Sequence, residues 1–367
     1  MRDATHAADD AAMPAAQATP PAIPSASADE YGAHARARRL YLQQAPAADV
    51  RAAIIAASAD WTDVDEQEKV LHALGLASAS GLSATYRQRL LKLVLDGLGR
   101  QNCEVHEELL GAYLALLQQK GDDDAPAGWS TLAFERRGGA TVRLRVRDTI
   151  GGGAETGCVL WPAALLLAGW LDHRADALAG LRVLELGAGA GLPGLVAARC
   201  AAVGSVTLTD VVPATLENLR HNCRGAAGVE VRALDWHACA ASEAAGEPPV
   251  DLILCADVVY EPTLLPALAA TLKAILRRSA AGGAAAPRAL LAAERRSDEL
   301  WSALLGELAR VHLKWDDLGA AARAEAAKEE CGFFVPEEAL PRLQLLELRA
   351  VECPNGKDAI EVGRFRT

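Results

Sequence analysis

The spacing of hydrophobic residues divides the chain into a helical first part and a mixed second part. From Glu30 to about Lys120, apolar residues recur at intervals of three and four, as at Leu109, Tyr113 and Leu117. This spacing places them on one face of a helix, so the first part predicts a bundle of short amphipathic helices.

Beyond about residue 128 the pattern changes to short apolar strands separated by helical stretches. Residues 141–147 alternate strictly between polar and apolar, which is typical of a half-exposed strand. The further strands expected are 181–186, 205–209, 229–234, 251–256, 289–293 and 343–351, and the expected helices are 192–200, 214–221 and 263–276. This alternation predicts an α/β fold with a mostly parallel, doubly wound sheet covered by helices on both faces.

Composition adds an expected domain division and excludes one class of partner. Residues 1–30 are rich in Ala, Pro, Ser and Asp and hold almost no large apolar side chain, so we expect a disordered tail. The rest divides into a helical domain at 31–125 and an α/β domain at 126–367. The net charge of −11 argues against direct nucleic-acid binding, because phosphate contacts need a basic surface.

The sequence also indicates a cytoplasmic protein without a membrane partner. No segment is apolar over the length that a membrane-spanning helix needs, and the first residues show no secretory pattern. The eight cysteines include no C-x-x-C pair, which favours reduced thiols. His221 and His237 stand alone among small and apolar residues, so we expect no metal site.

A strand that ends in a glycine-rich turn is the most informative feature of the chain. Residues 183–194 read V-L-E-L-G-A-G-A-G-L-P-G, which is a buried strand, a glycine turn and a helix start. Glycines let the backbone bend tightly and approach a ligand that a Cβ would keep away. Gly189, Gly191 and Gly194 also satisfy G-x-G-x-x-G, so a dinucleotide fold is an alternative, as is a turn without a ligand.

Acidic and aromatic residues at three strand ends favour S-adenosyl-L-methionine as the ligand. Glu185, just before the turn, can serve the cationic amino-acid end of this cofactor. Asp210 closes the next strand and suits the two ribose hydroxyls, although a nicotinamide cofactor would also place an acid there. Asp235 and Trp236 follow the third strand, where they offer a carboxylate for the adenine amino group and an aromatic plane beside the ring.

Four segments in order resemble the protein-lysine branch of the seven-β-strand methyltransferases, lysine methyltransferase family 16. Residues 185–194 look like motif I of that family, and T-G-C-V-L-W-P-A-A at 156–164 is similar to its T-G-x-x-x-W-x-A-A segment. L-D-W at 234–236 and A-D-V-V-Y at 256–260, which is similar to D-x-x-Y, complete the set. The helical first part looks most like that of the elongation factor 2 lysine methyltransferases.

This resemblance implies a seven-stranded Rossmann-like sheet and an enzyme that moves a methyl group from S-adenosyl-L-methionine to a lysine of a protein, with elongation factor 2 as the implied substrate. Trp161 would then line the cofactor cleft, or else belong to the core. Gly187, Ala188 and Gly189 would run under the methionine part of the cofactor, and the small Ala256 would let the cofactor lie close.

Asp257 and Tyr260 are the residues expected to carry the chemistry. A lysine arrives charged, with an ordinary pKa of ~10.4, and must lose a proton before its nitrogen attacks the methyl group. Asp257 can hold the incoming ammonium and Tyr260 can orient it. The alternative is that Asp257 merely caps the next helix, near Pro262.

Other functions and other segments stay open. The chain could be a small-molecule methyltransferase whose first helices close over the cleft, or a non-catalytic protein-binding adaptor with the same fold. Arg143, Arg145 and Arg147 are expected on a solvated strand face, with a basic stripe for an acidic partner as the alternative. Residues 331–336 could form a lid that faces the substrate, or could pack against the sheet.

Overall fold

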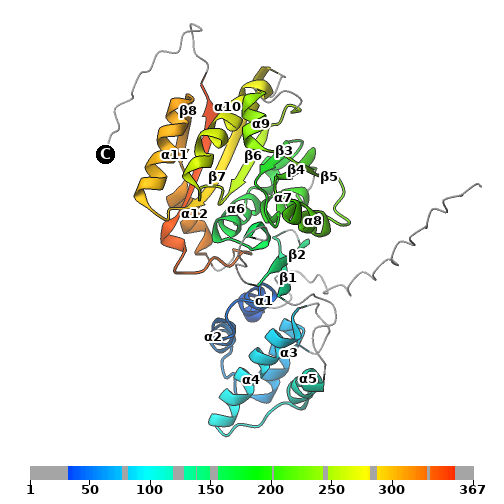
Figure 1. The fold of residues 1–367 in the computed structure, drawn as a ribbon. Coiled ribbons are helices and arrows are strands. Elements are labelled where there is room, and N and C mark those ends of the chain that lie inside the picture. Colours follow the sequence, from blue (N-terminus) through cyan, green and yellow to red (C-terminus); the bar gives the residue numbers. More distant parts are fainter. Residues whose placement is uncertain are drawn as a thin grey trace, which may run out of the picture.

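A computed structural model describes most of the chain after the first 31 residues. The described residues are 32–76, 82–118, 128–137, 139–148, 156–200, 202–242, 247–281, 287–328 and 331–351. The tail 1–30, which we predicted to be disordered, lies outside the described residues. Figure 1 shows a helical region and an α/β region, with a two-stranded hairpin between them.

The α/β region is built on a seven-stranded sheet with the order β5-β4-β3-β6-β7-β9-β8. β9 is antiparallel to both of its neighbours, and the other described pairings in this sheet are parallel. The strands are β3 (Arg182–Leu186), β4 (Ser205–Asp210), β5 (Val229–Ala233), β6 (Leu252–Ala256), β7 (Arg288–Glu294), β8 (Leu313–Asp317) and β9 (Leu343–Ala350). This mixed, mostly parallel sheet confirms the predicted fold class.

The strand order reverses at the centre of the sheet. From β3 the chain proceeds outward through β4 to β5, and it then returns to β6 on the other side of β3. In open α/β sheets a ligand binds outside the carboxyl ends of the strands at such a reversal. The fold therefore places a binding site above the ends of β3 and β6.

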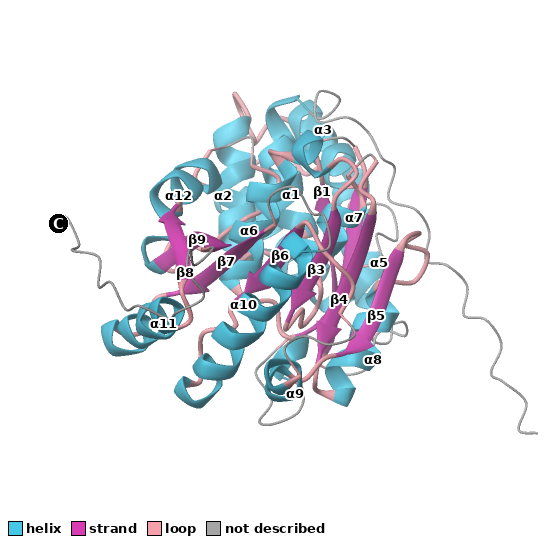
Figure 2. Cartoon of the chain, turned by 90° about the horizontal axis from the view of Figure 1, so that it is seen from above, coloured by secondary structure: helices cyan, strands magenta, loops and turns pink. Residues whose placement is uncertain are grey.

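Helices cover both faces of the sheet, as Figure 2 shows from above. One face carries a core around Leu167, Leu195 and Leu254, and the other carries a core around Leu184 and Leu272. The helices of this region are α6 (Pro162–Asp172), α7 (Leu192–Ala198), α8 (Pro213–Asn222), α9 (Trp236–Ala241), α10 (Leu265–Ala281), α11 (Asp298–Arg310) and α12 (Gly319–Ala326). Short 3-10 turns are η3 (Thr156–Cys158), η4 (Ala175–Leu178), η5 (Pro262–Leu264) and η6 (Leu340–Arg342). Within the part of the chain that the structure describes, no helix combines the length and the apolar character needed to cross a bilayer.

The helical region has a core of its own, as its periodicity predicted. Its elements are η2 (Gly32–His34), α1 (Ala35–Leu42), α2 (Ala47–Ala57), α3 (Val64–Leu74), α4 (Ala84–Arg100) and α5 (Glu107–Gln118). Gln43, at the end of α1, joins this region to the α/β region: its Nε2 donates to the Gly332 carbonyl and its Oε1 accepts from the Phe334 N–H, both at 2.7 Å. Arg38 pairs with Glu135 at 2.8 Å across the same junction.

The hairpin between the two regions corrects one expectation. β1 (Trp129–Glu135) pairs antiparallel with β2 (Thr141–Arg147). The arginines of β2 are half-buried rather than solvated, since Arg145 donates to Asn218 of α8 at 2.9 Å and its guanidinium lies 4.7 Å from the Trp129 ring centre. The solvated-face interpretation is therefore wrong for Arg145, because α8 covers that face.

The segment after α12 packs into the core, which was one of the two alternatives for residues 331–336. Phe333 is 1% exposed and stacks on Phe134 with ring centres 5.6 Å apart. Cys331 is also buried. Residues 331–336 are therefore fixed against β1 of the hairpin by this ring contact.

Candidate active site

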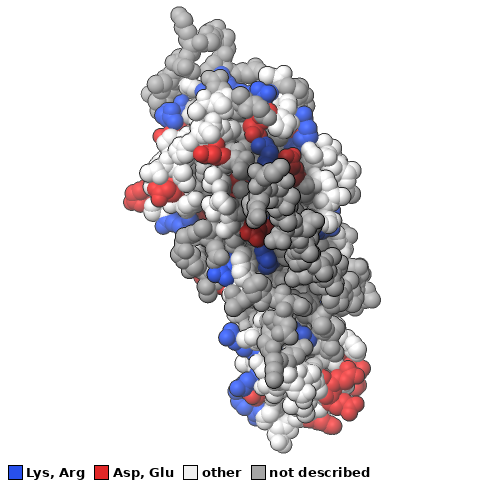
Figure 3. All heavy atoms as spheres, turned by 45° about the vertical axis from the view of Figure 1, so that its right-hand side comes forward, with Lys and Arg blue, Asp and Glu red and all other residues white. Residues whose placement is uncertain are grey.

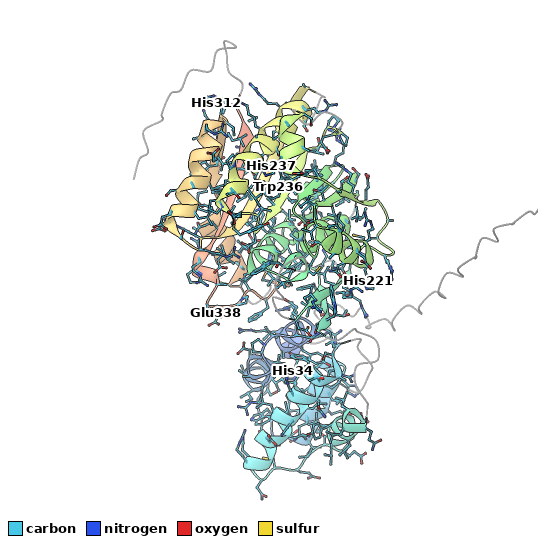
Figure 4. All side chains as sticks on the ribbon, viewed as in Figure 1. His34, His221, Trp236, His237, His312 and Glu338 are labelled. Atoms are coloured by element: carbon cyan, nitrogen blue, oxygen red, sulfur yellow. The ribbon has the colours of Figure 1, made fainter. Side chains whose placement is uncertain are left out.

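A cleft of about 440 Å³ opens where the strand order reverses. Its size is ordinary for a small-molecule or cofactor site. It contains all of the predicted site residues except Glu185, namely Trp161, Gly187, Ala188, Gly189, Asp210, Asp235, Trp236, Ala256, Asp257 and Tyr260. Figure 4 labels Trp236 and His237 within the α/β region, while His34 marks the helical region below.

The glycine turn after β3 forms the floor of this cleft. Gly187 has a φ of +62° and Gly189 a φ of +56°, a range that favours glycine. A Cβ on Gly187 would lie 3.2 Å from the Trp236 ring, and one on Gly189 would lie 2.8 Å from the carbonyl oxygen of Gly157. Glycine is therefore required at both positions by close packing against residues that line the cleft, and the turn presents bare backbone to it as a cradle.

Asp210, at the end of β4, holds this turn in place. Its Oδ2 accepts a hydrogen bond from the Gly189 N–H at 3.2 Å, and its Oδ1 accepts from Val211 and Val212 at 2.8 and 3.0 Å. The carboxylate still lines the cleft. Each carboxylate oxygen can accept more than one hydrogen bond, so these contacts leave acceptor capacity for ribose hydroxyls.

Glu185 lies elsewhere than its predicted role requires. It is 0% exposed and does not line the cleft. Its Oε2 accepts from the Gly194 N–H at 2.9 Å, at the start of α7, and its Oε1 has no hydrogen-bond partner among the described residues. Burial raises the pKa of this carboxyl to about 8, and the bond from Gly194 acts in the opposite direction. Glu185 thus fixes the helix start behind the turn rather than presenting a carboxylate to the cleft.

Trp236 and Asp235 lie at the start of α9. Asp235 is the N-cap of this short helix, and its Oδ1 accepts from the His237 N–H at 2.9 Å. Trp236 is half-buried, packs against the core of one sheet face and lines the cleft beside Gly187. A flat aromatic surface therefore borders the cradle on the side where the third strand ends.

Asp257 follows β6 and has an unusual backbone conformation. Its φ is +55°, which is rare for a residue with a side chain, and its N–H donates to Ala292 at 2.8 Å. The side chain is 3% exposed, with Oδ2 2.5 Å from Nη2 of Arg296 and Oδ1 3.4 Å from the Glu294 N–H. Burial raises the pKa of the Asp257 carboxyl, and the Arg296 charge opposes that shift. The helix-cap alternative is wrong, because Glu261 caps η5.

The remaining predicted residues border the same space. Trp161 is the residue before Pro162 at the start of α6, and Ala256 is the last residue of β6. Tyr260 stands at the rim with 57% of its surface exposed. Arg296, which the sequence did not single out, also lines the cleft, and its guanidinium lies 5.2 Å from the Trp161 ring centre. Its position just after a strand end is the signal that could have found it.

These residues fit S-adenosyl-L-methionine. The cradle at Gly187 and Gly189 would admit the methionine part, because neither residue places a side chain between the backbone and the cleft. Asp210 and Trp236 supply an acceptor and an aromatic plane on the neighbouring strand ends. The mostly apolar cleft with a few carboxylates agrees with the usual build of a cofactor site.

Comparison with known proteins agrees with this geometry. Residues 140–300 match the profile of a family described as lysine methyltransferase. "Histone-arginine methyltransferase METTL23" of Xenopus laevis is 34% identical over 162 residues, which cover 43% of this chain and 68% of that protein. "Protein-lysine N-methyltransferase EEF2KMT" of Homo sapiens is 30% identical over 194 residues, covering 48% of this chain and 57% of that protein.

These relatives are matched only in part. The chain spans 57% of the human EEF2KMT and 64% of the human METTL23. A solved SAM-dependent methyltransferase from Agrobacterium tumefaciens is 19% identical with a TM-score of 0.39, covering 63% of this chain and 72% of that one. The family assignment therefore depends on the sequence matches and on the strand order.

The strand order, the glycine cradle and the family match point to one conclusion. This chain belongs to the lysine methyltransferase family and is an S-adenosyl-L-methionine-dependent methyltransferase.

Proposed function

We propose that this enzyme methylates a lysine side chain of a protein substrate, and that elongation factor 2 is the first substrate to test. The similarity to a protein named protein-lysine N-methyltransferase EEF2KMT supports this choice. A cytoplasmic location is part of the proposal. The buried cysteines Cys200 and Cys255 are free thiols, which fits a reducing compartment.

The observation that carries the proposal is the buried carboxylate of Asp257 at the wall of the cofactor cleft. S-adenosyl-L-methionine supplies an electrophilic methyl group on a positively charged sulfur. Asp257 would bind the incoming ammonium and fix the direction of its nitrogen, and Tyr260 would orient it from the rim. The amine must lose its proton, which Asp257 or water would accept, before the nitrogen lone pair can bond to the methyl carbon; the bond between that carbon and the sulfur would break, and its electron pair would remain on the sulfur.

The open rim of the cleft supports a large substrate over a small one. Tyr260 and Val211 line the cleft, yet they are 57% and 56% exposed. A small substrate would usually be enclosed by apolar rim residues, whereas a protein surface can cover them on binding. The exposed rim therefore favours a protein substrate over the small-molecule alternative.

The helical region suits a role in selecting that substrate. Leu110, Leu114 and Leu117 recur along one face of α5 and are 43% to 50% exposed. On the face shown in Figure 3, acidic side chains gather on one side of this lower region and basic side chains on the other. We propose that the predicted domain at 31–125 contacts the protein substrate through such exposed side chains.

Arginine is a second candidate for the methylated residue. One relative is named a histone-arginine methyltransferase. In addition, the space between Asp257 and Trp161 already accommodates the guanidinium of Arg296. A bond to a carboxylate and stacking on an aromatic ring are the contacts that a guanidinium prefers.

Asp257→Asn tests the assigned chemistry. Asn retains the size and the acceptor for Glu294 but removes the charge that binds the ammonium. We expect near-wild-type affinity for S-adenosylhomocysteine by isothermal titration, and at least about a tenfold loss of methyl transfer, or ~1.4 kcal/mol in the barrier. Wild-type turnover would remove Asp257 from the chemistry. Loss of affinity together with turnover would place it in the cofactor site.

A further inference from the structure

The Asp257 carboxylate already holds a cation where a substrate cation is expected. Nη2 of Arg296 lies 2.5 Å from Oδ2 of Asp257, and the guanidinium stacks over Trp161 at 5.2 Å. The two side chains differ in exposure, with 3% for Asp257 and 32% for Arg296. The acid is therefore fixed in the wall, while the arginine reaches it from the solvent side of the cleft.

Arg296 has a second acidic partner close by. Oε2 of Glu294, the last residue of β7, lies 3.8 Å from Nε of Arg296. The other oxygen of Glu294 pairs with Arg342 at 2.7 Å. Because a carboxylate can accept several charge-assisted bonds, Arg296 can turn from Asp257 to Glu294 without losing an ionic partner.

The buried carboxylate needs a cation at every stage. Removing one member of a buried ion pair leaves an uncompensated charge, which is strongly unfavourable. In the structure Arg296 supplies the compensating positive charge. When a charged target side chain enters, it can take over the same role, and the number of cations on Asp257 stays at one.

We propose that Arg296 is a positioning residue that keeps Asp257 ionised before the substrate binds, yields it to the cationic target side chain and moves to Glu294. This inference rests on the proposed function, in which Asp257 receives the target amine. It adds a residue whose effect is exerted through Asp257 rather than through the cofactor.

The first test measures the pKa of the Asp257 carboxyl in the cofactor-free protein by carbon-13 NMR titration. The charged groups that face this carboxyl are Arg296 and Glu294, and the Asp210 carboxyl and Tyr260 hydroxyl line the same cleft. Arg296→Gln should raise the Asp257 pKa by about one unit or more, since the opposing positive charge is lost. An unchanged pKa would overturn the proposal.

The matched control is Arg295→Gln. Arg295 is the preceding residue, is 42% exposed and pairs with Asp298 outside the cleft at 2.8 Å. This change removes the same charge without touching Asp257, so the Asp257 pKa should stay at its wild-type value. A pKa shift as large as that of Arg296→Gln would mean that the loss of any nearby positive charge, rather than of the Asp257–Arg296 pair, changes the Asp257 pKa.

The second test measures methyl transfer to the protein substrate as a function of pH. With Arg296→Gln, the acid limb of kcat/KM should move to higher pH by about half a unit or more, because Asp257 then protonates earlier. Above that limb, KM should be equal to or lower than in the wild type, because no resident cation competes. Arg296→Lys should restore the wild-type limb.

Two results would contradict this account in different ways. A KM that rises at every pH would mean that Arg296 itself binds the substrate. An unmoved acid limb would mean that it has only a structural role. If the wild type methylates no protein, the proposed function fails, whereas the NMR titration still decides whether Arg296 controls the charge of Asp257.

Discussion

Replacing Glu185 by Gln should make stability less sensitive to pH. The carboxyl is fully buried behind the glycine turn, and burial raises its pKa to about 8 from an unfolded value of 4.5. The folded protein therefore holds this proton over a range of pH in which the unfolded chain releases it. Below pH 4.5 the carboxyl is protonated in both the folded and the unfolded chain, so it does not lower the free energy of unfolding. That free energy falls as the pH rises from 4.5 through the folded pKa of about 8.

The size of the effect follows from that shift. Between the two pKa values, each pH unit costs the wild type about 1.4 kcal/mol relative to a side chain that does not titrate. Gln keeps an acceptor for the Gly194 N–H and has no proton to lose. The free energy of unfolding of Glu185→Gln, minus that of the wild type, should therefore grow by about 2 kcal/mol from pH 6 to pH 8.

Urea unfolding of the cofactor-free proteins at several pH values measures this difference. Taking the difference at each pH cancels the titration of all other groups. Glu299→Gln, on the exposed first turn of α11, is the control for loss of a carboxylate outside the core. A difference for Glu185→Gln that stays constant from pH 6 to pH 8 would refute the reasoning, because it would mean that Glu185 is ionised in the folded protein.

Three further variants test the cleft and the junction. Gly187→Arg should abolish S-adenosylhomocysteine binding in isothermal titration while the protein stays folded by circular dichroism, since its side chain fills the cradle; unchanged affinity would remove the turn from the site. Trp236→Ala should weaken the same binding by about 1–3 kcal/mol, and an unaltered dissociation constant would make Trp236 a core residue only. Gln43→Ala should lower the free energy of unfolding by about 1–3 kcal/mol, because the carbonyl of Gly332 and the N–H of Phe334 lose their partner; equal stability would show that water replaces it.

Strands with a continuous apolar run or a strict polar–apolar alternation, such as β6 and β2, could be predicted from the sequence, and the charged edge strand β8 could not. β6, L-I-L-C-A, is buried over most of its length and was placed within a residue of its observed bounds. β8, L-K-W-D-D, was missed, because an edge strand exposes one side and its charges resemble a loop. α6 was missed for the opposite reason: it is apolar on all sides, so it shows no helical period.

The residues of the candidate site could also be predicted only in part. Cleft residues at strand ends could be located, because parallel strands bring their carboxyl ends to one edge. The location of Glu185 behind the turn could not be inferred. Successive side chains of a strand point to opposite sides, so a shift of one residue decides whether a side chain lies in the core or at the cleft. The Asp257–Arg296 pair depends on β6 and β7 being neighbours, which is a property of the sheet order rather than of local sequence.

Transfer of a labelled methyl group tests the central claim most directly. The purified full-length protein is incubated with methyl-labelled S-adenosyl-L-methionine and a lysate from cells that lack it, with Asp257→Asn as the paired control. The account predicts label on a lysine of one protein, identified by mass spectrometry, and at least about a tenfold reduction with the variant. Label that appears only in low-mass compounds, or equally with both proteins, would contradict it.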